Sequence, residues 1–223
     1  MFKKKKNLKR DLGVVIIPIL IIIIVLGFFL YKDIKALVPS NPSVDKDVDN
    51  AFTIAEYDYH LRENATEFQK MKFKELKDAI NSKEQDDSLV AGLIVENFVS
   101  DLYTMTNKSG SHDVGGVYYV FSPQRIQYFY DVKHNFYEQL SQLKDKYGSE
   151  NLLEVSSTTV EVNDGSGFEL DGKTYPSFDI TCEWSYKDGN MDTSEFVDRQ
   201  YFNVYKLDSG RFEIYNQFGD ANE

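Results

Sequence analysis

The sequence predicts an α+β protein in which an N-terminal single transmembrane helix precedes three or four helices packed on a four-stranded antiparallel sheet. Three observations carry this prediction. Residues 13–31 form an apolar run without a charged side chain. From about residue 51 to residue 147, apolar residues recur at helical spacing. From residue 151 onward they alternate with polar residues, which is the period of a half-buried strand. Helices followed by antiparallel strands make an α+β domain.

Residues 13–31 predict a membrane anchor. A helix of about 20 apolar residues crosses the hydrocarbon core of a bilayer. A secretory leader has a shorter apolar centre, of about 7 to 15 residues, followed by small residues at a cleavage site. The stretch YKDIKALVPS at the end of the run has no convincing site of that kind. We therefore expect an uncleaved signal anchor, and a long but cleaved leader is the alternative.

The charges beside the anchor predict its orientation. Residues 1–12 hold six basic residues and one acidic residue. Positive residues stay on the cytoplasmic side of a membrane helix. We expect a single-pass protein of the cell membrane, with this basic tail in the cytoplasm and an extracytoplasmic C-terminal domain.

The overall charge opposes some partners. The chain carries 25 basic and 36 acidic residues, and residues 13–223 alone have a formal charge of about −16. Binding to nucleic acid or to anionic lipid depends on positive charge, so we expect neither. The single cysteine, Cys182, leaves no internal disulfide and is expected to be a buried small hydrophobe. Together with the abundance of Lys, Ile, Asn, Tyr and Phe, it indicates a bacterial surface protein.

The part after the anchor divides into a linker and one domain. Residues 32–50 include VPSNPSVDKDVDN, whose prolines and acids indicate a linker. We expect the extracytoplasmic α+β domain at residues 51–219, which is a suitable size for one domain, and a short tail at residues 220–223.

The helical half of the domain begins with two segments of helical spacing, at residues 48–59 and 68–80. Asn64 with Glu67 predicts a capping box between them, so they form two helices or one bent helix. 

Two stronger helices follow. One begins at Asp87 or Ser88 and ends before Gly110. The longest predicted helix begins at its N-cap Ser122 and ends at Gly148. Its expected buried face consists of Ile126, Phe129, Tyr130, Phe136, Tyr137, Leu140, Leu143 and Tyr147.

The second half of the domain predicts a sheet. The apolar phase of its first strand changes between Val155 and Val160, which suggests a bulge. Asp171-Gly172 predicts a small hairpin at residues 168–175. The four long strands are expected within residues 152–162, 177–187, 195–207 and 211–218.

This order of elements resembles a known superfamily. An anchor, a short linker, a helical half ending in a long aromatic-rich helix, and a four-strand meander are similar to the cone-shaped, cystatin-like fold of nuclear transport factor and ketosteroid isomerase. The chain looks closest to its membrane-anchored branch, the inner-membrane scaffold proteins of type IV secretion and Gram-positive conjugation machines. The resemblance covers residues 50–219 as architecture. The Gram-negative scaffolds have an Asn-Pro-x-Gly turn in the folded domain, whereas the only Asn-Pro here, Asn41-Pro42, lies in the linker. No functional residue is therefore transferred.

The strands supply the candidate pocket or partner-binding residues: Trp184, Tyr186, Tyr201, Tyr205 and Tyr215. These aromatic side chains could line the concave side of a curved sheet. In related cone folds that side holds a ligand, catalytic groups or a partner. Core packing is the alternative for most of them, because aromatic side chains dominate protein cores.

A metal site is not expected. Asp45, Asp47, Asp49 and Glu56 match four positions of a calcium loop. Asn50 stands where the loop has Gly, and the prolines before it exclude the entering helix. A solvated acidic linker explains this segment better.

Catalytic residues and cofactors are not expected either. None of His60, His112 and His134 has a second His or a Cys at metal-ligand spacing. Asp101 and Tyr103 are a tempting acid–base pair, but side chains two apart on a helix point in different directions.

These observations favour a non-enzymatic, membrane-anchored scaffold or assembly component of a bacterial envelope complex, such as a secretion or conjugation machine. Its partners would be other membrane or envelope proteins, and it would be an oligomer or a complex subunit. The alternative is an extracytoplasmic sensor that binds a small ligand or peptide and acts through a membrane partner. An isomerase-like enzyme is the third and least favoured hypothesis.

Overall fold

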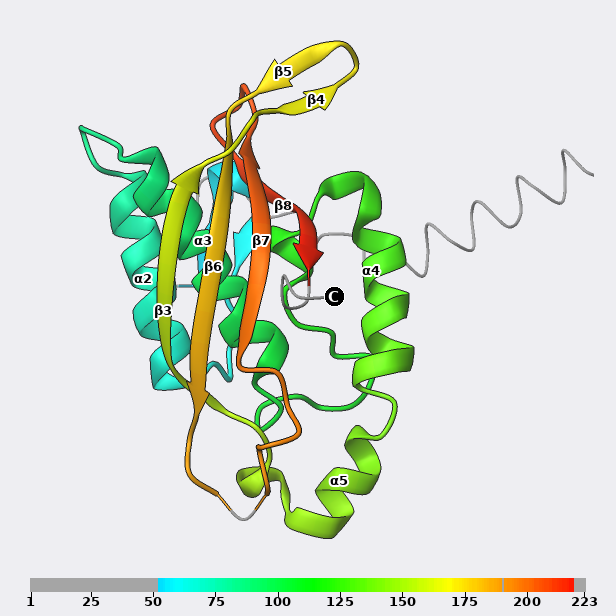
Figure 1. The fold of residues 1–223 in the computed structure, drawn as a ribbon. Coiled ribbons are helices and arrows are strands. Elements are labelled where there is room, and N and C mark those ends of the chain that lie inside the picture. Colours follow the sequence, from blue (N-terminus) through cyan, green and yellow to red (C-terminus); the bar gives the residue numbers. More distant parts are fainter. Residues whose placement is uncertain (1–51, 190, 219–223) are drawn as a thin grey trace, which may run out of the picture. The chain divides into compact units, whose positions relative to one another are not determined.

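The computed structural model describes residues 52–189 and 191–218 (Figure 1). These residues form an α+β structure in which helices accompany a four-stranded antiparallel sheet, as the sequence predicts. The predicted anchor at residues 13–31, the linker and both tails lie outside the described residues. Within the two described stretches, no helix combines the length and the apolar character needed to cross a bilayer.

Residues 52–60 do not form the predicted helix. They form β1 (Thr53–Ile54), a 3-10 turn η1 (Ala55–Tyr57) and β2 (Tyr59–His60), which pair as a small antiparallel hairpin. Asp58 has a left-handed backbone, with φ of 56°, and this conformation ends the turn. The hairpin instead pairs Ile54 with Tyr59, and both side chains are buried.

Four α-helices lie in the described part of the chain: α2 (Glu67–Ile80), α3 (Asp87–Tyr103), α4 (Arg125–Asp131) and α5 (Leu140–Tyr147). The first two begin close to the predicted positions. Thr66, rather than Asn64, caps α2 through a capping box with Gln69. Asp86 caps α3 by accepting hydrogen bonds from the backbone N–H groups of Ser88 and Leu89. These caps satisfy N–H groups that have no partner within the helix.

α3 is the central helix of the domain. Nearly all its residues from Val90 to Tyr103 are buried, and polar ones such as Asn97 have hydrogen-bond partners within the domain. Its backbone approaches the sheet closely at Gly92, where a Cβ atom would lie 3.2 Å from Val162. Figure 1 shows α2 and α3 on the same face of the sheet. The C-terminal end of α3 is therefore held firmly beneath the segments that follow.

The predicted long helix over residues 122–147 is broken. A 3-10 turn at Ser122–Gln124 leads into α4, a π-helical turn occupies Val132–Phe136, and α5 begins at Leu140. The π turn closes with a hydrogen bond from Tyr137 N to Val132 O of 2.9 Å.

The break changes which residues are buried. Tyr128 and Val132 are buried, whereas Ile126 and Tyr130 are 51% and 45% exposed, so their predicted burial is wrong. The extra residue of a π turn rotates the helix before it relative to the helix after it. One continuous apolar stripe cannot describe both halves.

The sheet matches its prediction closely. Its strands are β3 (Val155–Asp164), β6 (Ser177–Tyr186), β7 (Arg199–Lys206) and β8 (Phe212–Phe218), in the order β3-β6-β7-β8 with every neighbour antiparallel. The register shifts between Val155 and Ser157, within the predicted bulge. β4 (Phe168–Leu170) and β5 (Lys173–Tyr175) form the predicted hairpin at the end of the two long strands (Figure 1). Asp171 and Gly172 have φ values of 52° and 77°, as a two-residue hairpin turn requires.

The register places the core on the face that α3 covers. Ile180 lies opposite Phe202, and the ring of Phe202 meets that of Phe98 on α3 at 5.7 Å. Phe178 on β6 and Ile214 on β8 both lie opposite Val204 of β7, and they continue this row. The other face of the sheet is polar along most of its length and presents residues such as Asp179, Glu183 and Ser185, which are exposed.

Candidate functional site

The five aromatic candidates do not share one surface. Side chains alternate along a strand, and the register places Trp184 and Tyr186 on the face that α3 covers. Tyr201 and Tyr205 lie on the opposite face, because they pair with Thr181 and Ser177. Tyr215 lies with them, since its ring is 5.7 Å from that of Tyr205. The sequence alternation identifies the strands but does not relate the faces of one strand to those of the next.

Trp184 and Tyr186 are packing residues of the helix-covered face. Trp184 is 4% exposed and stacks on Tyr103 of α3, with ring centroids 4.6 Å apart. Tyr186 is half-buried, and its hydroxyl donates to Val197 O at 2.7 Å.

Tyr205 and Tyr215 belong to an aromatic cluster under the β4–β5 hairpin. Phe168 of the hairpin contacts both rings, at 4.5 Å and 4.3 Å. Tyr205 is fully buried, and its hydroxyl donates to Glu213 at 2.8 Å. Burial and this carboxylate raise the pKa of Tyr205 well above its ordinary value. Tyr201 stands apart, half-buried beside Arg199.

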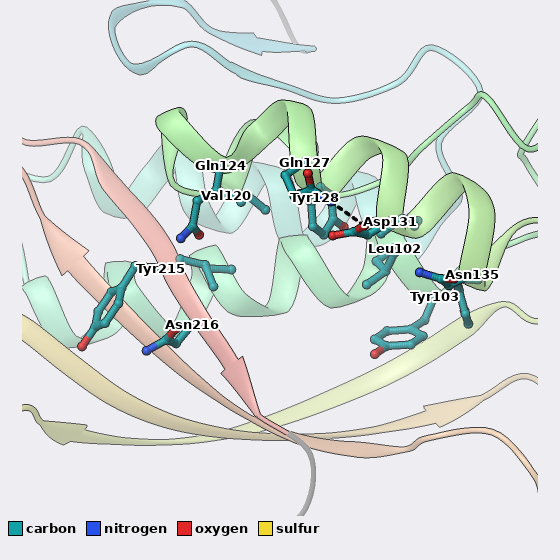
Figure 2. A pocket seen from close by; sticks show the side chains of 13 residues that line it. Leu102, Tyr103, Val120, Gln124, Gln127, Tyr128, Asp131, Asn135, Tyr215 and Asn216 are labelled. Atoms are coloured by element: carbon teal, nitrogen blue, oxygen red, sulfur yellow. Dashed lines mark hydrogen bonds between the residues drawn. The ribbon is translucent and has the colours of Figure 1, made fainter.

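An open cavity lies elsewhere, between α4 and the edge strand β8 (Figure 2). It is an open groove with a volume of about 560 Å³. Leu102 and Tyr103 of α3 contribute to its lining, as does the π turn through Val132 and Phe136. Exposed polar side chains also line it: Gln124, Gln127, Asp131, Asn135 and Asn216. We call this space the α4–β8 groove.

Tyr215 is the one candidate aromatic that also borders the α4–β8 groove. Figure 2 shows its ring directed away from α4, toward the other face of the sheet. The ring of Tyr215 therefore packs on Phe168, and the interior of the groove is left to Leu102, Val132 and Phe136.

A buried carboxylate, Glu213, fixes one end of the groove. It is 1% exposed and accepts hydrogen bonds from the Ser122 hydroxyl at 2.5 Å and from the Ser122 N–H at 3.1 Å. Arg211 Nε lies 3.0 Å from the same carboxylate, and Arg125 Nη2 lies 3.5 Å away. Because Ser122 and Arg125 begin the helical wall and Glu213 lies on β8, this cluster joins the two sides of the groove.

A second, partly buried cluster of charges surrounds Lys108 at the end of α3. Asp101 of α3 lies 2.8 Å from Arg62 Nε and 2.8 Å from Lys108 Nζ, and it accepts from the Gly116 N–H at 2.8 Å. Arg62 also lies 2.9 Å from Asp113. The Lys108 side chain is fully buried. These contacts bind the connection after α3 to the body of the domain.

The surroundings of this cluster shift the pKa values of Asp101 and Lys108. Burial alone would raise the pKa of Asp101, but Lys108, Arg62 and the Gly116 N–H outweigh it and hold that pKa well below its ordinary value. Burial lowers the pKa of Lys108 to about 8, although Asp101 opposes the shift.

Two tyrosine hydroxyls tie the helical wall to α3 and to the connection that follows it. Tyr128 donates to Gly115 O at 2.8 Å, and Tyr137 donates to Leu102 O at 2.5 Å. Gly116 is required here, because it has φ of +78° and a Cβ atom would lie 2.7 Å from the ring of Phe98. The wall and floor of the groove are thus connected through buried hydrogen bonds.

The other residues considered for chemistry have structural surroundings. Asp101 and Tyr103 do not meet, since the Tyr103 hydroxyl donates to Gln200 at 2.9 Å. Cys182 is fully buried, and burial raises the pKa of its thiol. His134 is exposed beside Tyr130. Among the described residues, no group of three His, Cys, Asp or Glu side chains could hold a metal ion. Most of the calcium-loop pattern lies outside them.

Sequence reasoning missed the polar lining of the groove. Gln124, Gln127, Asp131 and Asn135 recur at spacings of three and four, which is the pattern of one helix face. A polar stripe of this kind normally faces solvent, so its spacing alone does not indicate a groove.

Comparison of the chain with family models, with curated proteins and with solved structures returned no match.

Proposed function

We propose that this chain is a non-enzymatic, membrane-anchored assembly component of a bacterial envelope complex, such as a secretion or conjugation machine. Its extracytoplasmic domain binds other envelope proteins, and residues 13–31 confine it to the membrane. The proposal includes the cone-like fold, which the helices on one face of an antiparallel sheet support.

The observation that carries the proposal is the α4–β8 groove. It combines an apolar interior, a polar margin and the edge strand of a sheet. Depletion of charge at the centre with polar residues at the rim is the usual composition of a protein interface. Asp131 is the one acidic or basic residue among those that line it.

Three buried or partly buried carboxylates support a structural use of the domain's charges. Asp101 and Glu213 are held by cations and hydrogen-bond donors, as described above, and Glu96 accepts from Thr158 at 2.5 Å and lies 3.1 Å from Lys72. A carboxyl group that acts as a general acid usually has a raised pKa, and that of Asp101 is lowered.

A sensor of small ligands is the second candidate function. The amide groups of Gln124, Gln127, Asn135 and Asn216 surround the groove and could orient a polar ligand. A thermal-shift screen of the full-length protein in detergent tests this candidate. A metabolite that raises the unfolding temperature of the wild type, but not that of an Asn135→Arg variant, would favour the sensor over the assembly component.

The assembly proposal is tested by affinity capture of the full-length protein from its host in mild detergent, followed by mass spectrometry. We expect a stoichiometric set of membrane proteins together with an ATPase. Asn135→Arg places a bulky cation at the groove and should release the partners. Asn163→Arg makes the same change at an exposed position of β3 and should retain them. Recovery of the bait alone would contradict the proposal.

A further inference from the structure

Part of the free edge of β8 already pairs with another segment of the same chain. Val120 forms a parallel bridge with Ile214, and Phe121 N donates to Ile214 O at 2.8 Å. At Ser122 the chain leaves the sheet and enters the helical wall. Residues 120 and 121 thus extend the sheet beyond β8 for a short distance. The chain then enters the helical wall, beside the α4–β8 groove.

Beyond Ile214, β8 still has backbone groups that point away from the sheet. In an antiparallel ladder, successive residues direct their N–H and C=O groups to alternate sides. Lys206 N donates to Pro176 O, so Lys206 and Phe202 direct these groups toward β6. Gln217, which pairs with Phe202, therefore directs its backbone groups outward. Within the described residues, no strand pairs with β8 along residues 215–218 on that side.

We propose that an extended, basic segment of a partner protein adds a strand to β8 along residues 215–218, within the α4–β8 groove. This inference rests on the proposed function and specifies the chemistry of the partner. Main-chain hydrogen bonds to an exposed strand edge supply affinity, and pockets for alternate side chains supply specificity. The segment continues the course that Val120 and Phe121 begin.

The groove defines the sequence pattern of the segment. Every second side chain of an added strand points toward the helical layer. Leu102, Val132 and Phe136 line that side, so these positions of the segment are apolar. The alternate side chains point away from α4, and residues 13–223 have a formal charge of about −16, which favours a basic partner. The alternate positions of the segment are therefore basic.

A second copy of the chain does not suit this site. Figure 1 shows α4 standing beside β8, where a neighbouring sheet would have to continue. Two copies would also bring two strongly acidic domains together. The chain's own run of six basic residues lies before the anchor, and in the proposed topology it is on the cytoplasmic side of the membrane. A single extended strand from another protein avoids these conflicts.

The probe for this inference is a short, end-blocked peptide that alternates valine with lysine. Its binding to the full-length protein in nonionic detergent is measured by fluorescence anisotropy. We expect N-methylation of the peptide backbone on one set of alternate residues to weaken binding by about tenfold or more, and methylation of the other set to have little effect. Only pairing along one edge of the peptide produces this asymmetry. Equal effects of the two methylations would overturn the inference, as would failure of the unmethylated peptide to bind.

Two variants locate the probe on β8. Gln217→Pro removes an outward N–H at an edge position, where proline is tolerated, and should weaken binding by about tenfold. Gln217→Ala retains the N–H and should bind as the wild type does. Equal affinity in the two variants, with unfolding temperatures matched, would overturn the inference.

Affinity capture separates this inference from the proposed function. If Gln217→Pro retains the full set of envelope partners that the wild type captures, the assembly function stands and strand addition at β8 is wrong. If the wild type captures no envelope partners, the proposed function fails, whether or not the peptide binds.

Discussion

Asp101 shows how a single residue organises this domain. A buried ion pair is expensive to desolvate, and removal of one partner leaves an uncompensated charge in the interior. Asp101 has two cationic partners, Arg62 and the fully buried Lys108, and it also accepts from a backbone N–H. The residue is therefore expected to contribute strongly to the stability of the folded domain.

We expect Asp101→Asn to lower the free energy of unfolding by about 3 kcal/mol or more, because Lys108 would remain buried without its counter-ion. Urea unfolding followed by circular dichroism measures the change. Asp145→Asn removes an exposed carboxylate on α5 and should change the free energy by less than about 0.5 kcal/mol. Similar losses in the two variants would contradict the structural role of Asp101.

The same cluster predicts a pH dependence. Asp101 and Asp113 both have pKa values below the ordinary value of 3.8 in the folded protein. As the pH falls, the unfolded chain binds protons before the folded chain does, so the stabilisation is complete above about pH 5 and is lost progressively below it. We expect the urea midpoint to decrease below that pH, and to decrease less steeply in Asp101→Asn. A urea midpoint that stays constant between about pH 5 and about pH 2 would contradict this prediction.

Tyr137 offers a test of the connection between wall and floor. Its fully buried hydroxyl donates to Leu102 O, and Tyr137→Phe would leave that carbonyl unsatisfied. We expect a loss of about 1–2 kcal/mol in unfolding free energy. Tyr130→Phe, at a position that is 45% exposed, is the matched control and should be nearly neutral.

At the scale of elements, α3 and the π-helical turn differ in how deeply they are buried. α3 is buried on almost every side, whereas the π turn and the residues after it include the exposed side chains of His134, Asn135 and Glu138. Local opening costs least where few apolar contacts are lost. The groove thus has a rigid floor and a wall that opens more readily.

Hydrogen exchange measured by mass spectrometry should resolve this difference. We expect the amides of α3 to exchange most slowly and those of residues 132–139 to exchange several orders of magnitude faster, since each 1.4 kcal/mol of opening free energy is about tenfold in rate. Uniform protection from residue 125 to residue 147 would indicate one continuous rigid helix instead.

The sequence predicts some of these elements better than others for physical reasons. Strict alternation from Phe178 to Tyr186 identifies β6, and Asp171-Gly172 identifies its neighbouring hairpin, because strand period and turn chemistry are local properties. The π turn depends on tertiary contacts of Tyr137 and Val132, and no local residue type requires it. The segment at residues 52–60 is likewise held by distant partners, such as the contact of Tyr59 with β8.

Less of the candidate site than of the fold could be predicted from the sequence. Tyr215 is the one proposed aromatic that borders the groove, and its ring points away from α4. Whether two strands share a face depends on their register, which the sequence of either strand does not contain. Asn135 and Gln127 line the groove, but a polar stripe on a helix does not by itself indicate which element it faces.

At the scale of the whole molecule, the native cysteine makes the proposed topology easy to test. Cys182 is fully buried and its thiol pKa is raised, so it should not react with a membrane-impermeant maleimide. On intact cells we expect Ser43→Cys, in the linker, to be labelled and Asn7→Cys to be labelled only after permeabilisation. Labelling of Asn7→Cys from outside would reverse the proposed orientation.

The contact of Tyr59 with β8 has a consequence for the order in which the domain forms. The Tyr59 hydroxyl donates to Phe212 O and accepts from Phe212 N, across 153 positions of the chain. The hairpins of the sheet join near neighbours and can form as soon as they are synthesised, but this contact must wait for the last strand. Such distant pairings slow folding, because the chain loses the entropy of a long loop before the contact is gained. A chain that ends before Phe212 would therefore lack this contact and leave Tyr59, which is fully buried in the folded domain, without its partner on β8.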